Sequence, residues 1–218
     1  MNNKQKLAQM LSLQDKLNTF ILGADWKNSD ITDWKRAAWL ECAELIEHIG
    51  WKWWKKQSPN LSQAHIELSD IMHFMLSDCL VERCNEDDLL DSLENVPEDY
   101  YDDIDDVRLI IEELVFYLLD SQAQEDYYAI FFEVCRRLDL SFDELYFIYM
   151  SKNVLNIFRQ DNGYKEGTYI KQWPSMIEPS QTSEDNVYLD FFMQEAKKTK
   201  PDNLYEFIYN KLQENYPG

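Results

Sequence analysis

The chain has 218 residues, of which 45% are hydrophobic and 14% aromatic, so it is long and apolar enough to build a packed core. Its formal net charge is −20, from 21 basic and 41 acidic residues, which argues against a general surface for nucleic-acid polymers or anionic membranes. A phosphate ligand stays compatible with this charge, because bound metals and a few local cations can supply the opposite charge.

The spacing of apolar residues predicts an all-α protein. Only 5 Gly and 6 Pro are present, none of them between Val107 and Asn162, and no segment alternates as a strand would. We therefore expect a single all-α domain over 1–218, a multi-helix bundle with a variable and mobile acidic section at about 84–140. The sequence contains no apolar run of 18 residues, so no membrane span is predicted.

The first predicted helix covers residues 3–22. Gln14 and Asn18 lie four residues apart beside its apolar face. An amide both donates and accepts hydrogen bonds, which suits the edge of a pyrimidine base, although exposed amides on a helix surface are the ordinary arrangement. The residues expected on the apolar face are Met10, Leu13, Leu17, Phe20 and Ile21.

The second predicted helix begins after a cap at Thr32 or Asp33 and ends near Lys56, before a Ser-Pro-Asn turn. The third follows that turn and extends to about Arg83. Each helix has an apolar stripe, and packing the stripes on a common core would bring the two helices together. The stripes are Ala38, Cys42, Leu45 and Ile49 in the second helix, and Ala64, Leu68, Ile71 and Met75 in the third.

These two helices each carry a pair of acids three residues apart, Glu41 with Glu44 and Glu67 with Asp70. Residues at this spacing project from one face of a helix. Four carboxylates at one place repel, so a cation would have to lie between them, and oxygen ligands favour Mg²⁺ or Mn²⁺ over zinc. The alternative is that these acids are ordinary exposed helix residues. His73 follows Asp70 by three residues and is expected to hydrogen-bond at the edge of this face rather than to bind metal.

The acid-rich residues 82–106 predict a solvated connection with short helical pieces. Further helices are predicted near 105–120, 123–138 and 142–160, and two more within 185–215, separated by Pro201.

Residues 152–171 reverse the charge of the chain locally, with four cations against two acids, a net charge of +2. Lys152, Asn156 and Arg159 share one polar face of the predicted helix, while Val154, Leu155 and Phe158 point into the core. A loop with Tyr164 and Lys165 between two glycines follows. This pattern is typical of a phosphate-binding face, but also of cations that complement a helix terminus.

The cysteines Cys42, Cys79, Cys84 and Cys135 lack metal-finger spacing. Two of them lie in strongly apolar helical runs, where reduced, buried thiols are expected, and a reducing cytoplasm is the simplest setting. The group Trp51, Trp53 and Trp54 could line an aromatic pocket. For two of the three, packing in a core or an interface is expected.

Four blocks of this sequence resemble the dimeric, all-α dUTPase family within the all-α nucleoside triphosphate pyrophosphatases. The paired acids alone indicate only the broader superfamily, and the second and fourth blocks are the specific ones. The blocks are LQDKLN (13–18), WLECAELIEHIGWKWWKK (39–56), HIELSDIMHF (65–74) and KNVLNIFRQDNGYKEGTY (152–169).

The resemblance implies a homodimer that cleaves dUTP to dUMP and pyrophosphate. Glu41, Glu44, Glu67 and Asp70 would hold Mg²⁺, and Glu41 would also deprotonate the attacking water. The residues that match base and sugar positions are Gln14, Asn18, Trp51, Trp54 and His73. Those that match phosphate positions are Lys55, Lys152, Asn156, Arg159, Tyr164 and Lys165.

Two other functions stay open at this point. One is a pyrophosphatase of broader specificity, acting on dCTP or dUDP as well, because the choice of uracil over cytosine depends on amide orientations that a sequence does not fix. The other is a regulatory protein whose closure on a nucleotide controls a partner, with the acidic segment 82–106 as a contact surface.

Overall fold

The computed structural model describes residues 1–96, 106–120, 126–176, 178 and 180–218. Its contacts group into two compact units, Met1–Tyr149 and Met150–Gly218. The single domain over 1–218 remains a prediction. The mobile acidic section predicted at about 84–140 falls in part on 97–105 and 121–125, outside the described residues.

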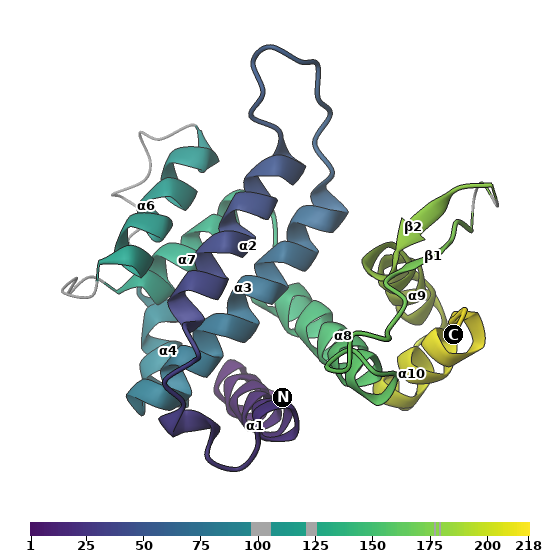
Figure 1. Ribbon diagram of the computed structural model, residues 1–218. Helices are drawn as coiled ribbons and strands as arrows, with labels where there is room; N and C mark the ends of the chain where they lie inside the picture. The colour runs from purple at the N-terminus through teal and green to yellow at the C-terminus, as the bar shows by residue number, and fades with distance from the viewer. Residues whose placement is uncertain (97–105, 121–125, 177, 179) are drawn as a thin grey trace. The chain divides into compact units, whose positions relative to one another are not determined.

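The regular secondary structure of the described residues is almost entirely helical, which confirms the all-α prediction (Figure 1). In the first unit, the elements are α1 (Asn3–Leu22), the 3₁₀ turn η1 (Trp26–Asn28), α2 (Trp34–Ile49), α3 (Leu61–Glu82), α4 (Glu86–Glu94), α6 (Val107–Leu119), α7 (Tyr127–Arg137) and the start of α8 (Phe142–Asp161). The second unit holds the rest of α8, β1 (Gln172–Pro174), β2 (Thr182–Glu184), α9 (Asp185–Thr199) and α10 (Leu204–Asn215).

Helix α2 ends earlier than its sequence predicted. Asp33 caps its start, as expected, by accepting a hydrogen bond from the backbone N–H of Arg36. Gly50 then adopts a φ of +85° and its N–H donates to the carbonyl of Ile46, which closes the helix. The predicted end near Lys56 is therefore wrong, and residues 50–60 form a loop to α3.

Helices α2 and α3 lie side by side and are joined by this loop (Figure 1). Their facing stripes are buried as predicted, except that Ile49 is only half-buried. Removing apolar surface from water in this way is the main stabilising contribution to such a pair. The fully buried residues of the two stripes are Ala38, Cys42, Leu45, Ala64, Leu68 and Ile71.

The buried face of α1 is rotated relative to the predicted one. It is centred on Gln14, with Met10 and Leu17 on either side, and the amide of Asn18 is buried as well. Phe20 was expected in the core but is 56% exposed. At 100° per residue it lies about 120° around the helix from Gln14, so it points away from the buried side.

In the second unit, Val154, Leu155 and Phe158 of α8 are buried as predicted, and α9 and α10 lie on either side of Pro201. The expectation that no strand would form is wrong, because β1 and β2 pair antiparallel with Trp173 opposite Ser183. Strands of three residues are too short to show an alternating pattern. Burial of Trp173 against Phe158 holds this hairpin in place.

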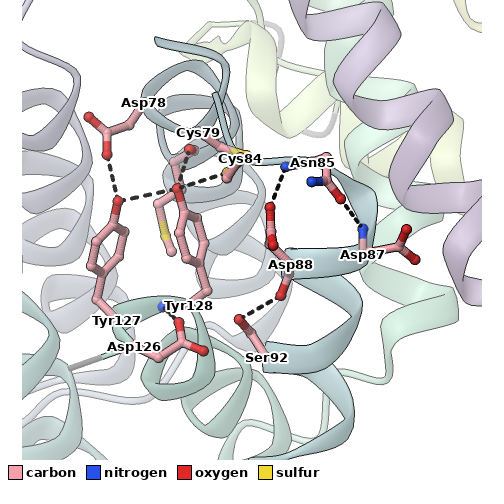
Figure 2. The surroundings of a disulfide bond; sticks show 11 residues. Asp78, Cys79, Cys84, Asn85, Asp87, Asp88, Ser92, Asp126, Tyr127 and Tyr128 are labelled. Carbon is pink, nitrogen blue, oxygen red and sulfur yellow. Dashed lines mark hydrogen bonds between the residues drawn. A yellow bond between two sulfur atoms is a disulfide. The ribbon is translucent and has the colours of Figure 1, made fainter. Parts of the chain in front are cut away.

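Cys79 and Cys84 form a disulfide (Figure 2). Cys42 and Cys135 are free and buried. The prediction of reduced thiols is confirmed for the second pair and wrong for the first. The reason is the end of α3, where Arg83 adopts a left-handed conformation and turns the chain back, so that the N–H of Cys84 donates to the carbonyl of Cys79.

Among the helices that the structure describes, none combines the length and the apolar character needed to span a bilayer.

Candidate functional site

Three of the four predicted acids meet between α2 and α3. Glu41 projects from α2, and Glu67 and Asp70 project from α3, with one carboxylate oxygen of each within 4.8 Å of the others. The buried stripes pack the two helices together and so bring these side chains to one place. Cys42, the neighbour of Glu41, is one of the fully buried residues of these stripes. Glu44 is exposed and lies outside this group of three.

We call Glu41, Glu67 and Asp70 the acid cluster. Glu67 is only 3% exposed, while Glu41 and Asp70 are half-buried. Three carboxylates this close, one of them out of solvent, repel unless a cation or a proton lies between them. Carboxylate oxygens are the ligands that Mg²⁺ and Mn²⁺ prefer. The donor set therefore fits a divalent metal of this kind.

His48 contacts the acid cluster but was not among the predicted site residues. Its Nε2 lies 3.2 Å from Oε1 of Glu67. Its backbone carbonyl accepts a hydrogen bond from the N–H of Asn60, which ties the end of α2 to the start of α3. The signal for it in the sequence is spacing, since His48 follows Glu41 by seven residues and so lies on the same side of the helix.

A buried hydrogen-bond network lies between α1, α3 and α8, and we call Gln14, Asn18, His73, Ser77 and Tyr149 the amide network. Nε2 of Gln14 donates to Oδ1 of Asn18 at 3.0 Å and to Oγ of Ser77 at 2.9 Å. Nδ2 of Asn18 donates to the same Oγ at 2.9 Å. On its other side, Oε1 of Gln14 lies 2.6 Å from Nδ1 of His73 and 2.9 Å from the hydroxyl of Tyr149.

The structure thus brings together three of the residues predicted to read the base, Gln14, Asn18 and His73. Each is 3% exposed, and the ring of His73 stacks on Tyr149 with 4.1 Å between centroids. Sequence reasoning missed Ser77 and Tyr149. For Ser77 the signal is a polar residue four positions after His73 in an otherwise apolar run.

The tryptophans of the α2–α3 loop are exposed in this chain. Trp51, Trp53 and Trp54 are 40%, 90% and 55% exposed, so none of them lies in its core. Nε1 of Trp51 donates to a carboxylate oxygen of Glu47 at 2.8 Å, and its ring meets that of Trp54 edge to face. Lys55 is exposed on the same loop.

In the second unit, the polar face of α8 packs against the start of α9. Lys152 is 1% exposed and donates to Oδ1 of Asn186 at 2.7 Å. Arg159 donates to both oxygens of Asp185, each at 2.8 Å, and the hydroxyl of Tyr169 donates to the same carboxylate at 2.9 Å. The sequence predicted this face but not its partners on α9.

Burial of Asp185 acts against its charge, but the hydrogen bonds and charge of Arg159, together with the charge of Lys152, outweigh it and hold the pKa of that carboxyl below its usual 3.8. Burial and the Asp185 charge raise the pKa of Tyr169, so its hydroxyl stays a donor. Of the other residues in the predicted phosphate face, Asn156 accepts a hydrogen bond from Arg159 at 3.3 Å, whereas Tyr164 and Lys165 are exposed.

A cavity of about 410 Å³ lies between α4, α7 and the start of α8, lined by Phe132, Arg136 and Leu145 among others. None of its lining residues belongs to the acid cluster or the amide network, so its size alone does not make it the functional site.

A protein-family model described as dUTPase matches residues 6–164. The match includes the acid cluster, the amide network and α8, and it ends before β1, β2, α9 and α10. No curated protein matches the chain.

Proposed function

The chain belongs to the dUTPase family and is a dUTP diphosphatase, and we propose that it works with Mg²⁺ held by its acid cluster. The observation that supports this proposal is the approach of Glu41, Glu67 and Asp70 within 4.8 Å. Mn²⁺, which takes the same oxygen ligands, is the expected substitute. Glu44, which is exposed, joins the metal ligands in this proposal as the second acid of its helix.

The products of the reaction are dUMP and pyrophosphate. Bound Mg²⁺ would supply the positive charge that neutralises the triphosphate and would make water more acidic. Glu41 orients the attacking water and accepts its proton, since it is the half-buried acid that α2 contributes to the cluster. Oε1 of Glu67 lies 3.2 Å from Nε2 of His48, a contact that helps to fix the direction of its carboxylate.

The remaining roles extend from the same proposal. The base meets the amide network together with Trp51 or Trp54. The phosphates meet Lys55 and the polar face of α8 with its following loop. We propose a cytoplasmic homodimer that has no nucleic-acid polymer or membrane as partner. The residues of the phosphate-binding part are Lys55, Lys152, Asn156, Arg159, Tyr164 and Lys165.

Pyrophosphate release tests this function directly. The purified protein is assayed over a panel of dUTP, dCTP, dTTP, dATP and dUDP, first with Mg²⁺, then with EDTA, then with Mg²⁺ restored. We expect turnover of dUTP that EDTA abolishes and Mg²⁺ restores. Turnover of dUTP that persists in EDTA would refute the metal dependence, and equal turnover of dCTP would identify the broader pyrophosphatase.

Substitution Glu41→Gln tests the proposed base. It keeps the size and hydrogen-bonding capacity of the side chain but removes the group that accepts the proton, so we expect turnover to fall at least about 100-fold while dUTP still binds. Glu112→Gln, on the exposed side of α6, is the matched control and should leave turnover unchanged. Turnover near that of the wild type in Glu41→Gln would remove Glu41 from this role.

A further inference from the structure

Ser77 occupies the centre of the amide network and determines which end of each amide faces it. Its side chain is fully buried, and its hydroxyl donates to the backbone carbonyl of His73 at 2.9 Å. A hydroxyl has one hydrogen, so towards Gln14 and Asn18 this oxygen can only accept. Both amides must therefore present their NH₂ groups to Ser77, as they do at 2.9 Å.

Tyr149 fixes the opposite end of Gln14. Its hydroxyl lies 2.9 Å from Oε1 of Gln14 and 3.0 Å from the carbonyl oxygen of Met10. Both oxygens are acceptors, so the hydroxyl is the donor and shares its single hydrogen between them. Complete burial raises the pKa of Tyr149 and keeps that proton in place. With Nδ1 of His73 as the second partner of that oxygen, Gln14 uses all of its hydrogen-bonding positions within the protein.

Among the described residues, Asn18 uses fewer of its hydrogen-bonding positions than Gln14 does. Its hydrogen bonds to the described residues use one of the two Nδ2 hydrogens and one of the two lone pairs of Oδ1. One donor and one acceptor are left on the same amide. Uracil offers the complement, an acceptor at O4 and a donor at N3, whereas cytosine offers a donor at N4 and an acceptor at N3. Reversing the amide would reverse this preference.

We propose that Ser77 and Tyr149 are positioning residues for base selection: they hold the Gln14 and Asn18 amides in the orientation that suits uracil and opposes cytosine. In this assignment Gln14 supports the network and Asn18 reads the base, which rests on the proposed function of the network as the base site. All five residues belong to the unit Met1–Tyr149 and are at most 3% exposed, which reduces the competition of water for their hydrogen bonds.

The test is the ratio of kcat/KM for dUTP to that for dCTP in Ser77→Ala and Tyr149→Phe. A ratio of two substrates measured on one preparation does not depend on how much of the protein is folded, so loss of stability alone does not change it. We expect the ratio to fall about tenfold in each variant, from the loss of about one hydrogen bond to a buried amide. The change should come from a higher KM for dUTP, with kcat nearly unchanged.

The chain offers a matched control for each substitution. Tyr146→Phe removes a hydroxyl that also joins α8 to a glutamine of α1, since it donates to Oε1 of Gln9 at 2.7 Å outside the network. Ser92→Ala removes a hydroxyl that donates to the carbonyl four residues earlier, as that of Ser77 does, but that lies outside the amide network. Both controls should keep the wild-type ratio.

Three outcomes would overturn the inference. They are a ratio within about twofold of the wild type in both variants, an equal fall in the controls, and a wild-type ratio near one. A change of about twofold lies well below the roughly tenfold change expected from one lost hydrogen bond. Absence of dUTP turnover by the wild type would instead contradict the proposed function. In that case the affinities for dUMP and dCMP, measured by calorimetry on the same five proteins, test the positioning role without catalysis.

Discussion

The carboxylate of Asp185 accepts two hydrogen bonds from the guanidinium of Arg159, both at 2.8 Å. Asp185 is fully buried, so this is an internal ion pair and not a surface contact. It joins α8, which the family match covers, to α9, which lies beyond the match. The segment after residue 164 therefore supplies an acidic partner to Arg159, which the sequence predicted to face a phosphate.

Substituting Asp185 with Asn should destabilise the second unit strongly. Removing one partner of a buried pair leaves the other charge uncompensated, which costs about 3 kcal/mol or more. Urea unfolding followed by circular dichroism measures this loss. Glu195→Gln is the control, because it breaks a bridge to Lys211 whose side chains are 43% and 29% exposed, and it should cost under about 1 kcal/mol. Equal losses in the two variants would contradict a buried pair.

The same pair sets a pH dependence. Because Arg159 outweighs burial and lowers the pKa of Asp185, its ionised form is favoured in the folded state. Its contribution to stability is then complete above the unfolded pKa of 3.8 and is lost as the pH falls towards the lower folded pKa. The stability difference between wild type and Asp185→Asn should be constant from pH 7 to 5 and shrink below about pH 4. A stability difference between the two proteins that grew on acidification would contradict a lowered pKa of Asp185.

Magnesium should stabilise the first unit through the acid cluster. Ligand binding to the folded state raises the melting temperature, and three carboxylates that repel one another gain most from a cation. We expect Mg²⁺ to raise the melting temperature of the wild type but not that of Asp70→Asn. In EDTA the variant should melt no lower than the wild type, because one of the three repelling charges is gone. An equal Mg²⁺ effect on both proteins would place the ion elsewhere, and Glu112→Gln should respond as the wild type does.

Thiol counting checks the cysteine pairing. The native protein should react slowly with a thiol reagent at pH 8, because burial and the charge of Glu41 raise the pKa of Cys42 to about 12 and burial raises that of Cys135. Denatured without reductant, the chain should show two reactive thiols, and after reduction four. Cys84→Ser should show three in the denatured state whether reduced or not. Four thiols before reduction would mean that Cys79 and Cys84 are not joined.

The two helices that carry the acid cluster were predictable because their signals are local. The stripes through Cys42 and Leu68 show at helical spacing, and the acids stand at fixed positions beside them. Ser77 contacts Gln14 across 63 residues of sequence, and Tyr149 contacts the same Gln14 across 135. Contacts between residues so far apart leave no periodic pattern in the sequence. Nor does charge spacing show that Arg159 meets an acid 26 residues later.

The end of α2 illustrates a different limit. Apolar and aromatic residues continue past Gly50, so periodicity extends the helix to Lys56, but the backbone conformation of one glycine stops it. The short strands β1 and β2 were not predicted for a related reason. Their position is set by a contact between Trp173 and Phe158 in the core of the second unit, which no local pattern reveals.

The end of α2 at Gly50 also gives the chain a fluorescence signal that reports on one loop. It places Trp51, Trp53 and Trp54 in a solvent-exposed loop, while Trp26 and Trp173 are shielded. Indole emission shifts to longer wavelength in water, so the red edge of the fluorescence spectrum comes mainly from this loop, and acrylamide should quench it first. A nucleotide that covers the loop would shift that emission to the blue, and its binding could be followed without any added label.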